Sequence, residues 1–226
     1  MIQPARLFFL LLSVAILGLF IWNLTYAAGT CCAGPKAPII DSEMTEEEAF
    51  DGLNPQCPED IRKRQAIVTV TYYSSDNRIH QGQLVVDGDL EKDIKTIFDL
   101  ALKERFPIHS VIPISDKRFR KGGGWDDDLS MEANNTSAFN YRLSTGSSGR
   151  LSQHAYGRAI DINPFQNPYI KSDIILPKGS EYDPTVDGTL TTDHPIVRAF
   201  LLLGWEWGGT WTSCKDYQHF EKPLDK

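Results

Sequence analysis

Residues 152–161 read Ser-Gln-His-Ala-Tyr-Gly-Arg-Ala-Ile-Asp. Gly157 is expected in a turn, because glycine adopts backbone conformations that other residues avoid. The small and apolar residues that follow it predict a short strand over 158–162, which carries Asp161. The stretch therefore places His154 just before a turn and a carboxylate on the strand just after it.

A second polar cluster lies near the end of the chain, where residues 216–221 read Asp-Tyr-Gln-His-Phe-Glu. On a strand, His219 faces one side and Asp216 the other, unless a bulge turns Asp216 inward. His154, His219 and Asp161 can supply three ligands to Zn²⁺ and leave a fourth position for water, which a hydrolytic site requires. Asp216 would then exchange a proton with that water. Histidine and aspartate are more often structural, so spacing alone leaves both interpretations open.

Together the two clusters resemble the zinc D-Ala-D-Ala carboxypeptidase family of peptidoglycan peptidases, which includes VanY-like carboxypeptidases and L-alanyl-D-glutamate endopeptidases. The similarity covers residues 138–223. It rests on the seven-residue interval from His154 to Asp161, the glycine and alanine between them, the downstream Asp-x-x-His and the tryptophan-rich run just before it. The resemblance implies one Zn²⁺ per chain, bound by His154, Asp161 and His219. It also implies an α+β fold of the hedgehog/DD-peptidase type, with a small, mostly antiparallel sheet and flanking helices.

The resemblance implies roles for three further residues. Asp216 would be the catalytic acid/base, Arg142 would bind substrate and stabilise the developing oxyanion, and Ser152 would support substrate binding. Two positions depart from the pattern: many carboxypeptidase members carry Glu where Asp216 stands, and a Gln that often follows the arginine is Ser147 here. Asp216 looks more like the endopeptidase branch. Glu206 is a competing general base, although its place between two tryptophans suggests an ordinary strand residue.

Hydrophobic periodicity predicts most of the secondary structure. Alternating residues predict strands over 66–73 and 81–86, joined as a hairpin. Apolar residues at helical spacing predict an amphipathic helix over 90–105, begun by Asp89. Residues 117–135 show almost no apolar periodicity, which predicts a mobile surface loop, either a lid over the cleft or a plain insertion. Further predicted elements are strands over 137–141, 205–207 and 217–221 and a helix over 195–203, capped by Asp193 and stopped by Gly204. This order of elements is typical of an α+β fold.

The N-terminal region has a different composition. Residues 7–22 contain no charged residue, which predicts a cleaved signal peptide or an uncleaved membrane anchor within 1–28. Either alternative predicts an exported protein, periplasmic or extracellular, whose contact with the membrane is limited to this segment. Residues 29–60, rich in Pro, Gly and acidic residues, are expected to form a linker, and 61–226 the catalytic domain. In an oxidising compartment Cys57 and Cys214 could pair in a disulfide.

The composition narrows the class of protein. The chain has 23 Lys+Arg and 30 Asp+Glu, a formal charge of −7, which argues against broad nucleic-acid binding. We expect a monomer acting on peptidoglycan stem peptides, either as a D-alanyl-D-alanine carboxypeptidase or as an L-alanyl-D-glutamate endopeptidase. The alternative is a non-catalytic, zinc-stabilised domain that binds the cell wall or a protein. Trp205, Trp207 and Trp211 are expected in the core rather than in a glycan-binding groove.

Overall fold

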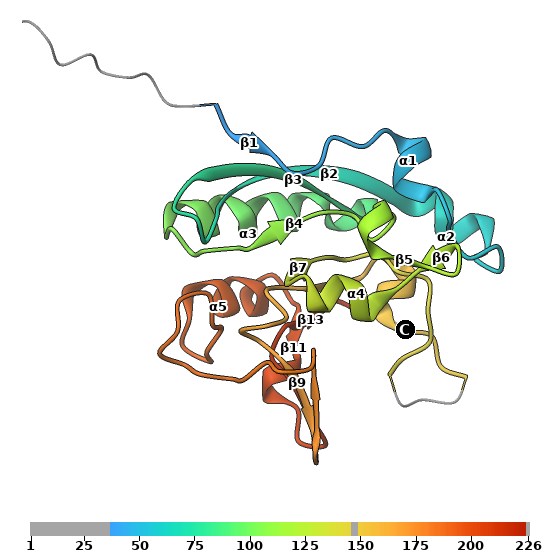
Figure 1. Ribbon diagram of the computed structural model, residues 1–226. Helices are drawn as coiled ribbons and strands as arrows, with labels where there is room; N and C mark the ends of the chain where they lie inside the picture. Colours follow the sequence, from blue (N-terminus) through green and yellow to red (C-terminus); the bar gives the residue numbers. More distant parts are fainter. Residues whose placement is uncertain (1–36, 146–148, 225–226) are drawn as a thin grey trace, which may run out of the picture. The chain divides into compact units, whose positions relative to one another are not determined.

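The structure is a computed structural model that describes residues 37–145 and 149–224. The predicted signal or anchor segment lies outside these residues. Within the described ranges, no helix is both long and apolar enough to cross a membrane. The fold is α+β, as expected, with several small sheets and few helices (Figure 1).

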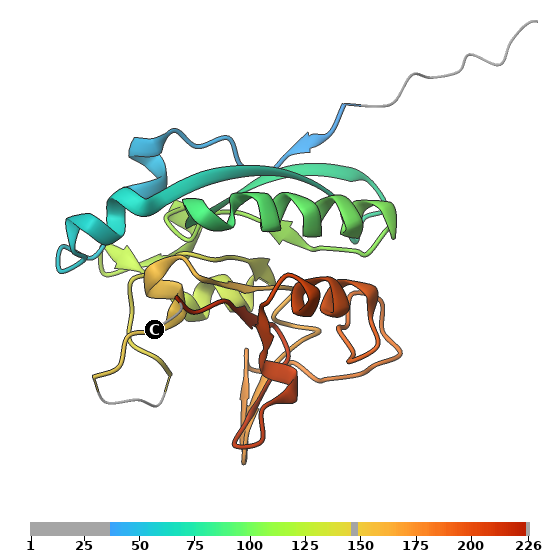
Figure 2. The ribbon, with the colours of Figure 1, turned by 180° about the vertical axis from the view of Figure 1, so that it is seen from behind.

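A long hairpin forms one layer of the fold. Strands β2 (Gln65–Tyr73) and β3 (Ile79–Asp87) pair antiparallel along their whole length, which confirms the predicted hairpin. Strand β1 (Ile39–Ile40) joins the outer side of β3 in parallel. Helix α3 (Glu91–Lys103) lies along the hairpin in both views (Figures 1 and 2). Its buried face is the predicted apolar stripe of Ile94, Ile97, Phe98 and Ala101.

The start of this helix differs in detail from the prediction. A single 3₁₀ turn, η1 (Gly88–Leu90), comes before α3. The side chain of Asp87 accepts a hydrogen bond from the backbone N–H of Asp89 at 3.0 Å. Asp87, rather than Asp89, therefore caps the turn that leads into the helix.

A second layer contains the predicted motif strands. Strands β8 (Ala159–Asp161), β13 (His219–Glu221) and β11 (Glu206–Trp207) form an antiparallel sheet in the order β11-β13-β8. Helix α5 (Pro195–Leu202) follows the expected helical stretch. Its cap is the side chain of His194, which accepts from the N–H of Ile196 at 3.2 Å, and not Asp193.

A separate three-stranded sheet lies beside the second layer. Its order is β10 (Ile174–Leu176), β9 (Tyr169–Lys171) and β12 (Lys215–Asp216), with antiparallel pairing throughout. The chain leaves this sheet after Asp216 and enters the motif sheet at His219. Asp216 and His219 consequently belong to different sheets, and the simple alternation of one strand does not apply to them.

One hydrophobic core joins the hairpin layer to the motif sheet. Leu84 and Phe98 from the first layer and Ile160 and Phe220 from the second belong to the same buried cluster. The rings of Phe200 and Phe220 stack with centroids 3.9 Å apart. The same core contains Trp205 and Trp207, as expected for two of the three tryptophans. Because protein interiors are closely packed, this shared core fixes the motif strands relative to the hairpin.

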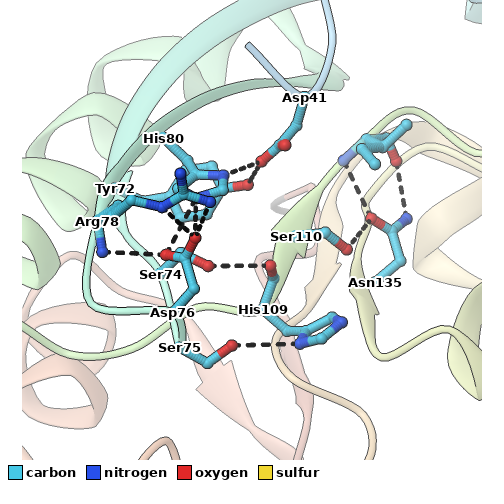
Figure 3. Close-up of polar contacts among 11 residues, drawn as sticks. Asp41, Tyr72, Ser74, Ser75, Asp76, Arg78, His80, His109, Ser110 and Asn135 are labelled. Atoms are coloured by element: carbon cyan, nitrogen blue, oxygen red, sulfur yellow. Dashed lines mark hydrogen bonds and ion pairs between the residues drawn. The ribbon is translucent and has the colours of Figure 1, made fainter. Parts of the chain in front are cut away.

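The prediction of a mobile loop over 117–135 is wrong. The segment contains η2 (Lys117–Phe119), the β5–β6 hairpin (Arg120–Lys121 and Gly124–Trp125), α4 (Asp127–Glu132) and β7 (Asn135–Thr136), which pairs with β4 (Ser110–Val111). Its order comes from polar side chains that bond to the backbone. Asp126 caps α4, and the buried amide of Asn135 bonds to both the N–H and the C=O of Ile112 (Figure 3). Hydrogen bonds from polar side chains to the backbone leave no trace in apolar periodicity.

The predicted linker is also partly folded. Within 37–60, α1 (Glu46–Phe50) begins with a capping box formed by Thr45 and Glu48. Phe50 is buried, and its ring meets that of Phe139 edge-on at 6.2 Å. Helix α2 (Glu59–Arg64) leads directly into β2. Apolar side chains spaced within a polar segment are sufficient to bind it to the domain, so the compact unit begins at Ala37.

Strand β1 is tied to the hairpin by a polar cluster around the buried side chains of Tyr72 and His80 (Figure 3). His80 lies between two carboxylates, 2.8 Å from Asp41 and 3.1 Å from Asp76. The hydroxyl of Tyr72 donates to the same Asp41 carboxylate. Burial, followed by this hydrogen bond, raises the pKa of Tyr72 far above its usual value. The cluster therefore stabilises the attachment of β1 to the hairpin at this edge of the sheet.

Two other expectations are corrected. Cys57 and Cys214 are both free, so the disulfide that the sequence left open is not formed between them. Cys57 packs in the N-terminal apolar cluster, whereas Cys214 lines the cavity described below. Residues 137–141 do not form a strand, and only a single bridge joins Ser137 to Asp161.

Candidate active site

The first motif folds into a short turn that orients His154. Residues Gln153–Tyr156 form a 3₁₀ turn, η3, and the hydroxyl of Ser152 accepts from the N–H of His154 at 3.3 Å. Gly157 ends the turn with φ +67°, in the left-handed region. A Cβ at this position would lie 2.6 Å from the backbone nitrogen of Asp87. The serine and glycine of the motif are thus needed to build the turn.

Three predicted metal ligands meet behind this turn. His219 and Asp161 lie directly opposite each other on β13 and β8, and the Nδ1 of His219 is 3.0 Å from Asp161 Oδ1. The Nε2 of His154 is 3.1 Å from Asp161 Oδ2 and 3.2 Å from His219 Nδ1. All three side chains are buried, and their ligand atoms lie within 4.8 Å of one another. Two imidazole nitrogens and one carboxylate oxygen form a donor set that fits Zn²⁺.

The outer nitrogen of each imidazole already has an acceptor. His154 Nδ1 lies 2.6 Å from the carbonyl oxygen of Ala138, to which it donates. His219 Nε2 lies 3.0 Å from Glu221 Oε2. These bonds leave His154 Nε2 and His219 Nδ1 to face the shared point, as second-shell partners do in metal sites. Glu221 was not anticipated from the sequence, although its position two residues after His219 on the same strand face could have indicated it.

The charges of the cluster favour a bound cation. Burial opposes ionisation of Asp161, but the charges and hydrogen bonds of His154 and His219 outweigh it and keep its pKa below the usual range. Burial likewise opposes protonation of His219, yet hydrogen bonds to Asp161 and Glu221 raise its pKa to about 10. Without a metal, the carboxylates thus hold a proton on His219. A divalent ion placed among the three ligands would take the place of that positive charge.

Asp216 lines the same cavity as the three ligands. Its Oδ1 is buried and has no hydrogen-bond partner among the described residues. Burial raises the pKa of Asp216 to about 6. The backbone here is tightly packed, because a Cβ on Gly208 would lie 2.5 Å from the carbonyl oxygen of Asp216. A fixed carboxyl group with a pKa near neutrality is suited to proton transfer.

Arg142 and Ser152 also line this cavity, which has a volume of about 390 Å³. The guanidinium of Arg142 is held by Asp127, whose Oδ2 lies 2.9 Å from its Nη2. Asp127 begins α4, so the segment mispredicted as a loop supplies the residue that positions the arginine. Ser152 acts as the cap of η3, a role that the resemblance did not imply.

Glu206 and the three tryptophans are the remaining residues that the sequence offered for the site. Glu206 is exposed on β11 and is not among the residues that line the cavity. Trp211, unlike the other two tryptophans of its region, does line it, with its ring centroid 5.4 Å from that of His219. The structure therefore places Asp216, and not Glu206, beside the three predicted ligands.

Comparison with known protein families agrees with this geometry. Residues 145–222 match the model of the D-alanyl-D-alanine carboxypeptidase family, which confirms the resemblance seen in the sequence. The matched segment contains both motifs. No solved structure matches the chain. The matched family is one of peptidases, so the match points to hydrolase chemistry.

Proposed function

We propose that this protein is a zinc metallopeptidase that hydrolyses amide bonds in peptidoglycan stem peptides. The observation that carries the proposal is the buried Oδ1 of Asp216, which has no hydrogen-bond partner among the described residues and shares one cavity with His154, Asp161 and His219. A domain that used a metal only for stability would have no need for such a carboxylate, because leaving a polar atom buried without a partner costs about 1–3 kcal/mol.

The residues divide the chemistry between them. Bound Zn²⁺ would lower the pKa of a coordinated water and polarise the scissile carbonyl group. Asp216 would accept a proton from the attacking water and return it to the leaving amine, a pair of steps that its pKa of about 6 suits. The guanidinium of Arg142, oriented by Asp127, would stabilise the negative charge that develops on the carbonyl oxygen.

Cations around the cavity support an acidic peptide substrate. Arg150 and Lys171 line it together with Arg142, beside the carboxylates of the candidate site and of Asp127, in a chain whose formal charge is −7. Stem peptides carry carboxylates, which these side chains can pair with at short range. The acidic chain offers no long-range attraction to an anionic polymer, so substrate capture depends on these local groups.

The proposal includes export. Peptidoglycan lies outside the cytoplasmic membrane, and the charge-free run at 7–22 is suited to direct the chain there. Fractionation of cells that produce the full chain, with detection of the protein in each fraction, tests this part. Recovery of the protein in the cytoplasm alone would contradict it.

The decisive experiment is digestion of purified peptidoglycan by the zinc-loaded protein, with and without a chelator. We expect chelator-sensitive release of new amino groups, abolished in Asp216→Asn. Mass spectrometry of the products identifies the bond, because loss of a terminal D-alanine and cleavage between L-alanine and D-glutamate give different masses. Binding to peptidoglycan with no release of amines would favour the non-catalytic alternative.

A further inference from the structure

A second hollow adjoins the candidate active site. It has a volume of about 580 Å³. Asp127 and Arg142 line both this hollow and the cavity of the predicted ligands. Their ion pair, at 2.9 Å, therefore lies at the boundary between the cavity of the predicted ligands and the second hollow. We name the larger compartment the neighbouring hollow.

The walls of the neighbouring hollow are firmly held. One wall is the turn at 52–55 and the other is the end of the β5–β6 hairpin. Both are tied to the backbone carbonyl of Asp51, which accepts from Trp125 Nε1 at 2.7 Å and from Arg120 Nη2 at 2.8 Å. The hollow is consequently preformed, which is the usual state of small-molecule sites.

The chemistry of the lining is neutral and amphipathic. Trp125 and Tyr141 are half-buried aromatic residues, and Leu53 adds apolar surface. Asn54 and Asn140 add amide groups, and Asn140 donates to Asp127 at 3.1 Å. Among the described residues that line the hollow, only the boundary pair is charged. A ligand that suits this surface has apolar C–H faces and neutral hydrogen-bonding groups.

We propose that the neighbouring hollow binds an N-acetylated amino sugar of the glycan to which the stem peptide is attached. This inference rests on the proposed function and extends it. The pyranose ring presents C–H groups to aromatic faces, while its hydroxyl and acetamido groups match the amides of Asn54 and Asn140. A continuing peptide fits less well, because stem peptides carry carboxylate and ammonium groups that the neutral lining leaves unpaired. The substrate would then be a glycan-attached peptide.

The test compares two substrates that share one stem peptide. One carries the N-acetylated disaccharide and the other is the same peptide without sugars. For the zinc-loaded wild-type protein we expect a lower KM for the glycan-attached peptide. The KM ratio, defined as the KM of the sugar-free peptide divided by the KM of the glycan-attached peptide, measures the preference for sugar. Tyr141→Ala should reduce this ratio about tenfold, which corresponds to the loss of roughly one buried aromatic contact. Asn54→Ala, at an exposed position, should reduce it by a smaller factor; because Asn54 Oδ1 also accepts from the N–H of Gln56 at 2.9 Å, the circular dichroism spectrum of this variant is compared with that of the wild type.

A matched control and a binding measurement complete the design. Phe165→Ala removes an aromatic side chain of 38% exposure that does not line the hollow, and it should leave the KM ratio unchanged. Calorimetry with the disaccharide alone requires no catalysis, so it tests the sugar site even if neither substrate is hydrolysed. Binding weakened in Tyr141→Ala but not in Phe165→Ala supports the inference.

Three results would overturn it. The first is equal KM values for both substrates in the wild-type protein, and the second is no calorimetric binding of the disaccharide. The third is a preference for a cross-linked peptide without sugars that Tyr141→Ala removes, which would assign the hollow to peptide. Failure of the proposed function is distinct, since it appears as no hydrolysis of either substrate while disaccharide binding persists.

Discussion

Replacing Gly157 by alanine tests whether the motif glycine is required by the fold. Gly157 has φ +67°, and an added Cβ would approach the backbone nitrogen of Asp87 to 2.6 Å. That nitrogen donates to the carbonyl oxygen of Gly157 at 2.9 Å. The side chain of Gln65, which is also in the way, can rotate aside, but the backbone nitrogen of Asp87 cannot. The turn must move away from the end of β3, and His154 moves with it.

The size of the effect follows from two terms. The left-handed conformation costs alanine about 1–2 kcal/mol. Loss of the hydrogen bond between Asp87 and Gly157 leaves a buried donor, which costs about 1–3 kcal/mol more. We therefore expect Gly157→Ala to lower the free energy of unfolding by about 2–5 kcal/mol. Gly179 provides a matched control, because it has φ +86° with no atom within 4 Å of the added Cβ. Gly179→Ala should cost only the first term, about 1–2 kcal/mol.

Urea denaturation of both variants, followed by circular dichroism, measures the two free energies. Titration with a zinc indicator should also show weaker metal binding for Gly157→Ala and wild-type binding for Gly179→Ala. Equal destabilisation of the two variants would refute the reasoning, since it would mean that the turn accommodates the Cβ and that only backbone strain matters.

Three further predictions concern the site. Asp216→Asn should retain zinc by metal analysis and lose about 10²–10⁴ in kcat, the usual contribution of general acid–base catalysis; a kcat within tenfold of wild type would assign the proton transfer elsewhere. His154→Ala should lose both zinc and hydrolysis, and an unchanged zinc content would disprove the ligand assignment. Burial opposes protonation of His219, but its carboxylate partners raise its pKa to about 10, so the metal-free protein is protonated there at pH 7. Zinc binding at pH 7 should then release about one proton, measured by calorimetry in buffers of different ionisation enthalpy, and uptake of protons or none would contradict this.

Regular elements with a hydrophobic period could be predicted from the sequence. The hairpin of β2 and β3 and helix α3 have clear periods of two and 3.6 residues, because each buries one face against the core. The structure of the segment 117–135 could not be predicted in this way, because Asp126 and Asn135 order it through hydrogen bonds to particular backbone groups. Similarly, the capping residues of η1, the turn before α3, and of α5 lie one or two residues from the predicted positions, because several neighbouring polar side chains could serve.

The sequence by itself singled out the residues that we propose carry the chemistry. His154 and Asp161 stand in one short motif and Asp216 and His219 in another, and the glycine between the first two is required by a local turn. Each motif can be read from neighbours along the chain, because its residues lie within eight positions of one another.

Only the tertiary structure decided how the chemistry is oriented and how far the site extends. Glu221 orients one imidazole, Asp127 holds Arg142, and the walls at 52–55 and Trp125 form a second compartment beside it. Asp127 and Arg142 are 15 positions apart in the sequence, and the 52–55 turn is farther still, so no local pattern connects them. Their meeting depends on the packing of separate elements around a shared core, which a sequence period does not record.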